Sequence, residues 1–177
     1  MILAAFGVGY TIGSVTTLPV WNWAITHRLG KRNAFMLSAV GLGVVFLTWL
    51  LAGPDEPIAF LYARFLLLGV FSAGSQVSAS AMLPDIMEHD RQRTGVSQEG
   101  LYAAAFSIVE KVANTIGPVL VGTLLGLTGF IASKGGVRPD QPAAAITAIQ
   151  LTVSVIPFGL TVIAAWCISK YDLSPAN

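Results

Sequence analysis

The stretch AFMLSAVGLGVVFLTWLLA at residues 34–52 decides the fold, because it runs for 19 residues without a charged side chain. A helix of this length rises about 28 Å at ~1.5 Å per residue, which nearly matches the ~30 Å hydrocarbon core of a bilayer. The composition agrees: 54% of the 177 residues are hydrophobic and 11% are charged, against ~25% charged in a typical soluble domain. The sequence therefore predicts an integral membrane protein.

The same composition excludes several other classes of protein. A net charge of +1 is too small for a basic nucleic-acid binder, so no nucleic-acid partner is expected. The single cysteine, Cys167, cannot build a disulfide scaffold, and two distant histidines leave no metal cluster to propose. No pairing of a nucleophile with a base is evident, so we expect neither an enzyme nor a tightly bound cofactor.

Short charged stretches on either side of residues 34–52 divide the chain into five apolar segments. Each has about the ~20 residues that a transmembrane helix needs, and the alternation of a membrane β-strand is absent. The expected fold class is all-α, a polytopic membrane protein with five transmembrane helices in a single domain over residues 1–177. The helices are predicted at about residues 3–25, 34–52, 58–84, 100–130 and 143–169.

Lysine and arginine residues concentrate in the connections on one side of the predicted helices. Six lie on that side and two on the other, a bias typical of cytoplasmic connections. The six are Arg28, Lys31, Arg32, Arg91, Arg93 and Lys170, and the two are Lys134 and Arg138. We expect an amino terminus outside the cell, a cytoplasmic carboxyl terminus and a bacterial inner-membrane location.

An odd number of spans and an apolar start predict a piece of a longer protein with further helices upstream. No lysine or arginine precedes Arg28, so the basic start of a signal peptide is absent. The alternative is a stand-alone five-helix membrane interaction protein without transport activity.

Three charged residues lie inside the predicted helices, where ionisable side chains are costly and often functional. Arg64 is six residues into its segment, close enough to the membrane surface for its side chain to reach water. Glu110 and Lys111 lie about 15 Å from the start of theirs, near the middle of the bilayer.

A polar stripe surrounds the second of these mid-membrane charges. Lys111 shares a helix face with Ser107, Asn114 and Thr115, at offsets of three and four residues. Such a stripe predicts one wall of a hydrated substrate or cation pathway, with Gln76 and Arg64 as further candidates. A structural ion pair that fixes helix register is the alternative for the charges, and hydrogen bonds between helices explain the polar residues around Gln76 equally well.

Pairs of small residues recur in the apolar segments. Gly9 and Gly13, like Gly122 and Gly126, are spaced four apart on one helix face, which lets two backbones approach closely. Ordinary tight packing explains these pairs, and a sliding interface between moving bundles is the alternative.

Two connections carry motifs that give the chain a family resemblance. The first reads LPVWNW at residues 18–23 and RLGKR at residues 28–32. The third reads MLPDIMEHD at residues 82–90, then RTG at 93–95 and EGLY at 99–102, and Lys111 follows. In this order the motifs resemble the carboxyl-terminal part of the glycoside–pentoside–hexuronide:cation symporters, the branch of the major facilitator superfamily that includes melibiose permease. The resemblance covers nearly the whole chain.

The resemblance implies a transporter of twelve helices in two bundles, with this chain supplying helices eight to twelve. It implies that Lys111 faces the central cavity and that charged residues form a cytoplasmic gate. The gate residues so implied are Asp85, Glu88, Arg28, Lys31 and Arg32. The family often has Asp and Tyr where this chain has Glu88 and His89, a departure from the melibiose-like pattern that keeps the charge.

The sequence therefore predicts part of a secondary active transporter, which carries out cation-coupled symport of a small solute of the sugar or glycoside class by alternating access. The coupling cation is Na⁺ or H⁺, and the resemblance places its main site in the amino-terminal half. The expected partners are the lipid bilayer, the amino-terminal helical bundle and the small-molecule solute.

Overall fold

The computed structural model describes residues 2–53, 56–131 and 140–171, and every regular element in this part of the chain is a helix. The predicted all-α class is therefore confirmed. The helices are α1 (Ile2–Ala24), the π-helical turn η1 (Ile25–Leu29), α2 (Gly30–Thr48), the 3₁₀ turn η2 (Trp49–Leu51), α3 (Ile58–Thr94), α4 (Glu99–Leu127), α5 (Ala143–Val153) and α6 (Val155–Ser169).

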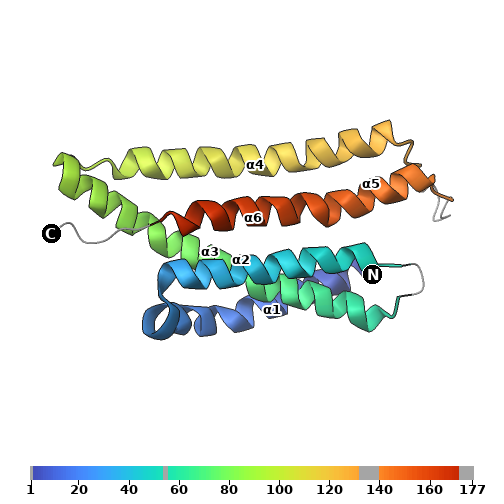
Figure 1. The fold of residues 1–177 in the computed structure, drawn as a ribbon, viewed down its shortest axis with the longest axis horizontal. Coiled ribbons are helices and arrows are strands. Elements are labelled where there is room, and N and C mark those ends of the chain that lie inside the picture. Colours follow the sequence, from blue (N-terminus) through green and yellow to red (C-terminus); the bar gives the residue numbers. More distant parts are fainter. Residues whose placement is uncertain (1, 54–55, 132–139, 172–177) are drawn as a thin grey trace.

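The helices run along the long axis of the molecule (Figure 1). α3 packs against α1 and α2, α2 also packs against α6, and α4 runs along one edge with α5 as its main neighbour. Residues 25–33, 85–99 and 169–171 consequently lie at one end, which we call the inner end, and residues 49–53, 56–58, 127–131 and 140–143 lie at the outer end.

Four helical stretches are long and apolar enough to cross a membrane: Phe6–Leu51, Ile58–Thr94, Glu99–Leu127 and Ala143–Ser169. The number of such stretches is four where five segments were predicted, because the first two predicted segments are joined through η1 without a break in the helix. The chain nevertheless reverses direction within this stretch, since α1 and α2 run in opposite directions in Figure 1. Gly30 follows η1 with a φ of 71°, a backbone conformation that favours glycine.

α3 continues well beyond its predicted end at Pro84, so residues 85–94 of the predicted connection are helical. Pro84 removes one backbone N–H, but the turns that follow are supported by side-chain bonds from Arg91 and Gln92 to Glu88. The helix ends at Thr94, and the next residue, Gly95, terminates it with a left-handed φ of 74°. Its 37 residues span about 55 Å, so the last turns extend past a ~30 Å hydrocarbon core.

α1 and α3 approach each other at glycine residues. A Cβ atom on Gly13 would overlap the carbonyl of Leu66, and one on Gly69 would overlap the carbonyl of Tyr10. Further along, the Trp21 indole N–H donates a 2.8 Å hydrogen bond to the Val70 carbonyl. The close approach at Gly13 favours tight packing over a sliding interface, because backbone atoms rather than mobile side chains meet there. A Cβ atom added to Gly122 or Gly126 on α4 would meet no atom of another described helix within 4 Å.

Candidate functional site

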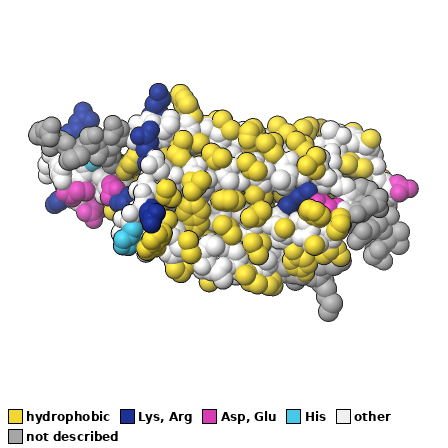
Figure 2. Space-filling model, turned by 60° about the horizontal axis from the view of Figure 1, so that its bottom comes forward, with side chains coloured by type: hydrophobic (Ala, Val, Ile, Leu, Met, Phe, Trp, Pro, Cys, Tyr) yellow, Lys and Arg dark blue, Asp and Glu magenta, His cyan; other side chains and the backbone are white. Residues whose placement is uncertain are grey.

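On the face drawn in Figure 2, charged side chains gather toward the two ends, and hydrophobic side chains cover most of the surface between them. This distribution is the one expected of a helical bundle in a bilayer. The inner end carries the basic residues of η1 and the start of α2 together with the acidic residues of α3. Lys134 and Arg138, which the sequence assigned to the opposite side, lie outside the described residues.

An ion pair joins α2 to α3 at the inner end. The Nζ atom of Lys31, on the first turn of α2, lies 2.7 and 2.6 Å from the two carboxylate oxygens of Asp85. Both side chains are partly exposed, at 37% and 42%. The family resemblance implied that Asp85 acts with the basic connection, and the structure places one of the three cations of that connection, Lys31, in direct contact with Asp85.

The end of α6 joins the same cluster. The Arg32 guanidinium donates a 2.6 Å hydrogen bond to the carbonyl of Ser169, in the last turn of α6. Two residues later, the hydroxyl of Tyr171 is buried and has no hydrogen-bond partner among the described residues. Burial, and secondly the charge of Asp85, raise the pKa of the Tyr171 phenol, so the hydroxyl is protonated at neutral pH. Ser169 and Tyr171 were not predicted, because neither is charged nor part of a recognised motif.

Two other predicted gate residues have local partners instead. The carboxylate of Glu88 accepts hydrogen bonds of 2.8 and 2.9 Å from Arg91, three residues later on the same helix. The Arg28 guanidinium lies over the ring of Trp23, 5.7 Å from its centroid. The structure therefore brings Asp85 together with Lys31, and places Arg32 beside them, while Glu88 and Arg28 face other partners.

The predicted polar stripe lies on α4, the helix at the edge of the bundle. Glu110, Lys111, Ser107, Asn114 and Thr115 are all exposed, and none has a side-chain ion pair within the described chain. The Thr115 hydroxyl bonds back to the carbonyl of Lys111 at 2.9 Å, as threonine commonly does in a helix. The exposed residues of the stripe therefore lie on α4, apart from Gln76 and Arg64, the other predicted pathway residues, which lie on α3.

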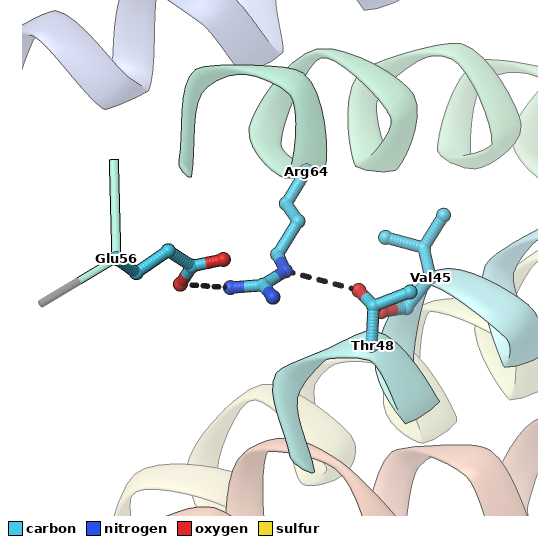
Figure 3. A network of polar contacts seen from close by, with 4 residues as sticks. All are labelled: Val45, Thr48, Glu56 and Arg64. Atoms are coloured by element: carbon cyan, nitrogen blue, oxygen red, sulfur yellow. Dashed lines mark hydrogen bonds and ion pairs between the residues drawn. The ribbon is translucent and has the colours of Figure 1, made fainter. Parts of the chain in front are cut away.

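Arg64 lies in a buried polar network at the outer end (Figure 3). Its guanidinium donates to the Glu56 carboxylate at 2.6 Å and to the Thr48 hydroxyl at 3.1 Å, and lies 5.3 Å from the centre of the Trp49 ring. Only 9% of the Arg64 side chain and 12% of the Glu56 side chain are exposed. These partners indicate a structural role for Arg64, because the network links the start of α3 to the end of α2.

Gln76 is exposed on α3, whereas its neighbour Ser75 faces α2. The Ser75 hydroxyl lies 3.0 Å from that of Ser38, a buried residue of α2. The polar residues of this segment therefore split between two directions: the serine contributes to helix packing, and Gln76 is available to a partner or to water. For Ser75, the structure therefore favours the alternative interpretation from the sequence, a hydrogen bond between helices.

The chain has clear relatives among known proteins. A family model described as MFS/sugar transport protein matches residues 1–175. An uncharacterized symporter of Synechocystis is 32% identical over 146 residues, which are 81% of this chain and 26% of the relative.

Two relatives come from Escherichia coli strain K12. One is a glucuronide carrier protein homolog, 27% identical over 168 residues (92% of this chain, 34% of the relative). The other is a putative glycoside/cation symporter, 26% identical over 168 residues (93% and 35%). The chain thus spans about a quarter to a third of the length of these three relatives.

Proposed function

The chain belongs to the MFS/sugar transport protein family, and from this premise we propose that it forms part of a secondary active transporter for a small solute of the sugar or glycoside class. The membership confirms the resemblance to the glycoside–pentoside–hexuronide:cation symporters. Solute movement is coupled to a cation, Na⁺ or H⁺, and proceeds by alternating access between this bundle and a second one. The names of the relatives support this proposal, because they include symporters and a glucuronide carrier homolog.

The observation that carries the proposal is the polar stripe on α4. An ionised lysine at the bilayer centre costs about 2.5–3.5 kcal/mol on insertion scales, so it requires water or a partner. Lys111 and Glu110 are exposed near the middle of a 29-residue apolar helix, beside Ser107 and Asn114. We infer that this face of α4 lines the solute or cation pathway against the other bundle.

The inner-end cluster has a different role in this proposal. Lys31 on α2 and Asp85 on α3 belong to the same bundle, so their contact holds the inner end of that bundle in one shape. We propose that this shape is the one in which the cytoplasmic side of the pathway is closed, and that the pair is the cytoplasmic latch. Arg32 adds the end of α6 to the latch through Ser169.

The orientation in the membrane follows from the same charges. Arg28, Lys31, Arg32, Arg91 and Arg93 lie at the inner end, which therefore faces the cytoplasm under the positive-inside rule. We propose that the described amino-terminal end of α1 lies on the outside and the end of α6 on the inside of a bacterial inner membrane.

The substitution Lys111→Met tests the pathway role, in a transporter that carries this chain. It removes the insertion cost of the charge and keeps a good helix former, so the variant should reach the membrane at normal or higher abundance. Concentrative uptake per membrane-inserted molecule should fall at least tenfold. The matched control Lys170→Met removes a lysine just after α6, and it should keep uptake near the parent value.

A structural role for Lys111 gives the opposite pattern. If the lysine pairs with a carboxylate only to fix helix register, Lys111→Met leaves that carboxylate without a partner and lowers abundance. Uptake per surviving molecule would then equal that of the parent, and this result would remove Lys111 from the pathway.

A further inference from the structure

A polar cavity of about 340 Å³ opens at the inner end, beside the latch. It is lined by the first turn of α2, residues 30–33, with Leu29, Asp85 and Tyr171. Its charges are two cations, Lys31 and Arg32, and one carboxylate, Asp85, which sum to +1. A cavity of this kind, at the end of membrane-spanning helices, suits a ligand with negative charge.

Hydrogen-bond donors outnumber acceptors in the cavity. The carboxylate of Asp85 already accepts two bonds from Lys31. The Tyr171 hydroxyl is buried without a partner among the described residues, and the Asn33 amide is exposed at the rim. A buried polar group without a partner costs free energy, so the cavity favours a ligand with several acceptor oxygens.

A separate apolar groove, which shares no lining residue with this cavity, lies further along the same two helices, toward the middle of the membrane. It lies between residues 39–44 of α2 and residues 158–165 of α6, and its volume is about 140 Å³. On α6 the groove begins four residues, or about 6 Å, before the Ser169 carbonyl that Arg32 binds. On α2, Val40 and Val44 follow Asn33 by seven and eleven residues and therefore share its helix face.

We propose that the cavity and the groove together form a binding site for one anionic phospholipid. The phosphate lies among Arg32, Asn33 and the hydroxyl of Tyr171, and one acyl chain lies in the groove between α2 and α6. A glycerol headgroup suits the cavity, because its hydroxyls can donate to Asp85. The helices already lie in a bilayer, so lipid is the occupant available to a site that combines a cationic end with an apolar groove.

Lipid binding to the intact purified protein tests the site without any measurement of transport. Native mass spectrometry in detergent should show phosphatidylglycerol bound several-fold more tightly than phosphatidylcholine with the same acyl chains. The variant Arg32→Gln should weaken phosphatidylglycerol binding about fivefold, the equivalent of about 1 kcal/mol for one basic residue near a membrane surface. The control Arg93→Gln removes a charge from the last turn of α3, outside the cavity, and should leave binding unchanged.

Two further variants separate the headgroup from the acyl chain and guard against misfolding. Tyr171→Phe removes only a hydroxyl, so it should keep the fold and reduce the preference for phosphatidylglycerol about twofold. Ala165→Leu fills the groove and should weaken both lipids equally. Inorganic phosphate at millimolar concentration should not displace the lipid.

Three results would overturn the proposal. The first is equal binding of the two lipids to the parent protein. The second is an equal effect of Arg32→Gln and Arg93→Gln, which would indicate a general surface charge effect. The third is displacement by inorganic phosphate, which would indicate a site for a free anion.

Discussion

Two ion pairs hold the two ends of the α2–α3 hairpin, with the same 2.6 Å separation and in very different surroundings. At the inner end, Lys31 and Asp85 are partly exposed to solvent. At the outer end, Arg64 and Glu56 are nearly buried, and Thr48 and Trp49 complete the surroundings of the guanidinium. Equal distances therefore do not make the two pairs equivalent.

The difference in burial decides what each pair can do. An exposed pair is screened by water and salt, so it stabilises little and can break and re-form during a transport cycle. A buried pair is hard to open, because each charge without its partner is left in a medium that solvates it poorly. The Lys31–Asp85 pair at the inner end can therefore open and close, whereas the Arg64–Glu56 pair at the outer end stays formed.

The substitution Arg64→Met should have the largest effect on stability. It keeps the volume of the side chain but leaves the Glu56 carboxylate nearly buried without its cation. We expect a loss of roughly 3 kcal/mol of folding free energy, as for other broken buried pairs. The measurement is the fraction of protein that stays folded on heating in detergent, with the exposed Arg93→Met as control.

A double variant sharpens this prediction. Arg64→Met combined with Glu56→Gln removes both charges, so it should recover a large part of the lost heat resistance. If the single variant is as stable as the parent, or the double variant is no better than the single one, the outer pair is not the permanent contact that the comparison requires.

The transmembrane helices could be predicted from the sequence because uncharged stretches of bilayer length have few other structures available. The extension of α3 could not, since Pro84 and the charges after it indicated a connection. Two of those charges, Glu88 and Arg91, instead pair along the helix. Charge density and proline mark where a helix leaves the membrane, which is a different point from where it ends.

The candidate site was predictable only in part, for a physical reason. The family resemblance implied that Asp85 and the basic turn belong to one gate, and the structure pairs Asp85 with Lys31 of that turn. The partner of Arg64 depends on how the connection before α3 folds back, and no periodic pattern encodes that. Tyr171 entered the site through the position of α6, which is set by packing against α2.

The substitution Asp85→Asn should have an intermediate effect, on rate more than on stability. The exposed pair contributes about 1 kcal/mol or less, so abundance in the membrane should stay close to that of the parent. The uptake rate per molecule should change severalfold, because the closed shape of the inner end loses its latch. Uptake with radiolabelled solute, divided by the amount of inserted protein, gives the comparison.

The result for Asp85→Asn can also contradict the proposed difference between the inner and outer ion pairs. A variant that fails to accumulate in the membrane would make Asp85 a folding residue, like the outer pair, and the latch would be withdrawn. The charge exchange Lys31→Asp with Asp85→Lys is a useful second test. It should restore the parent rate at least in part, since it rebuilds an ion pair between the same two helices.

The smallest effect is expected for Glu88→Ala. Glu88 pairs with Arg91 on its own helix, in an exposed position beyond the apolar part of α3, so breaking the pair releases no second helix. Alanine is the best helix former, and the end of α3 should stay helical without the pair. Heat resistance and uptake per molecule should both equal the parent values, measured beside Asp85→Asn in the same assays. A loss of uptake as large as that of Asp85→Asn would mean that Glu88 exchanges Arg91 for the basic residues of η1 during the cycle, which would place it in the latch.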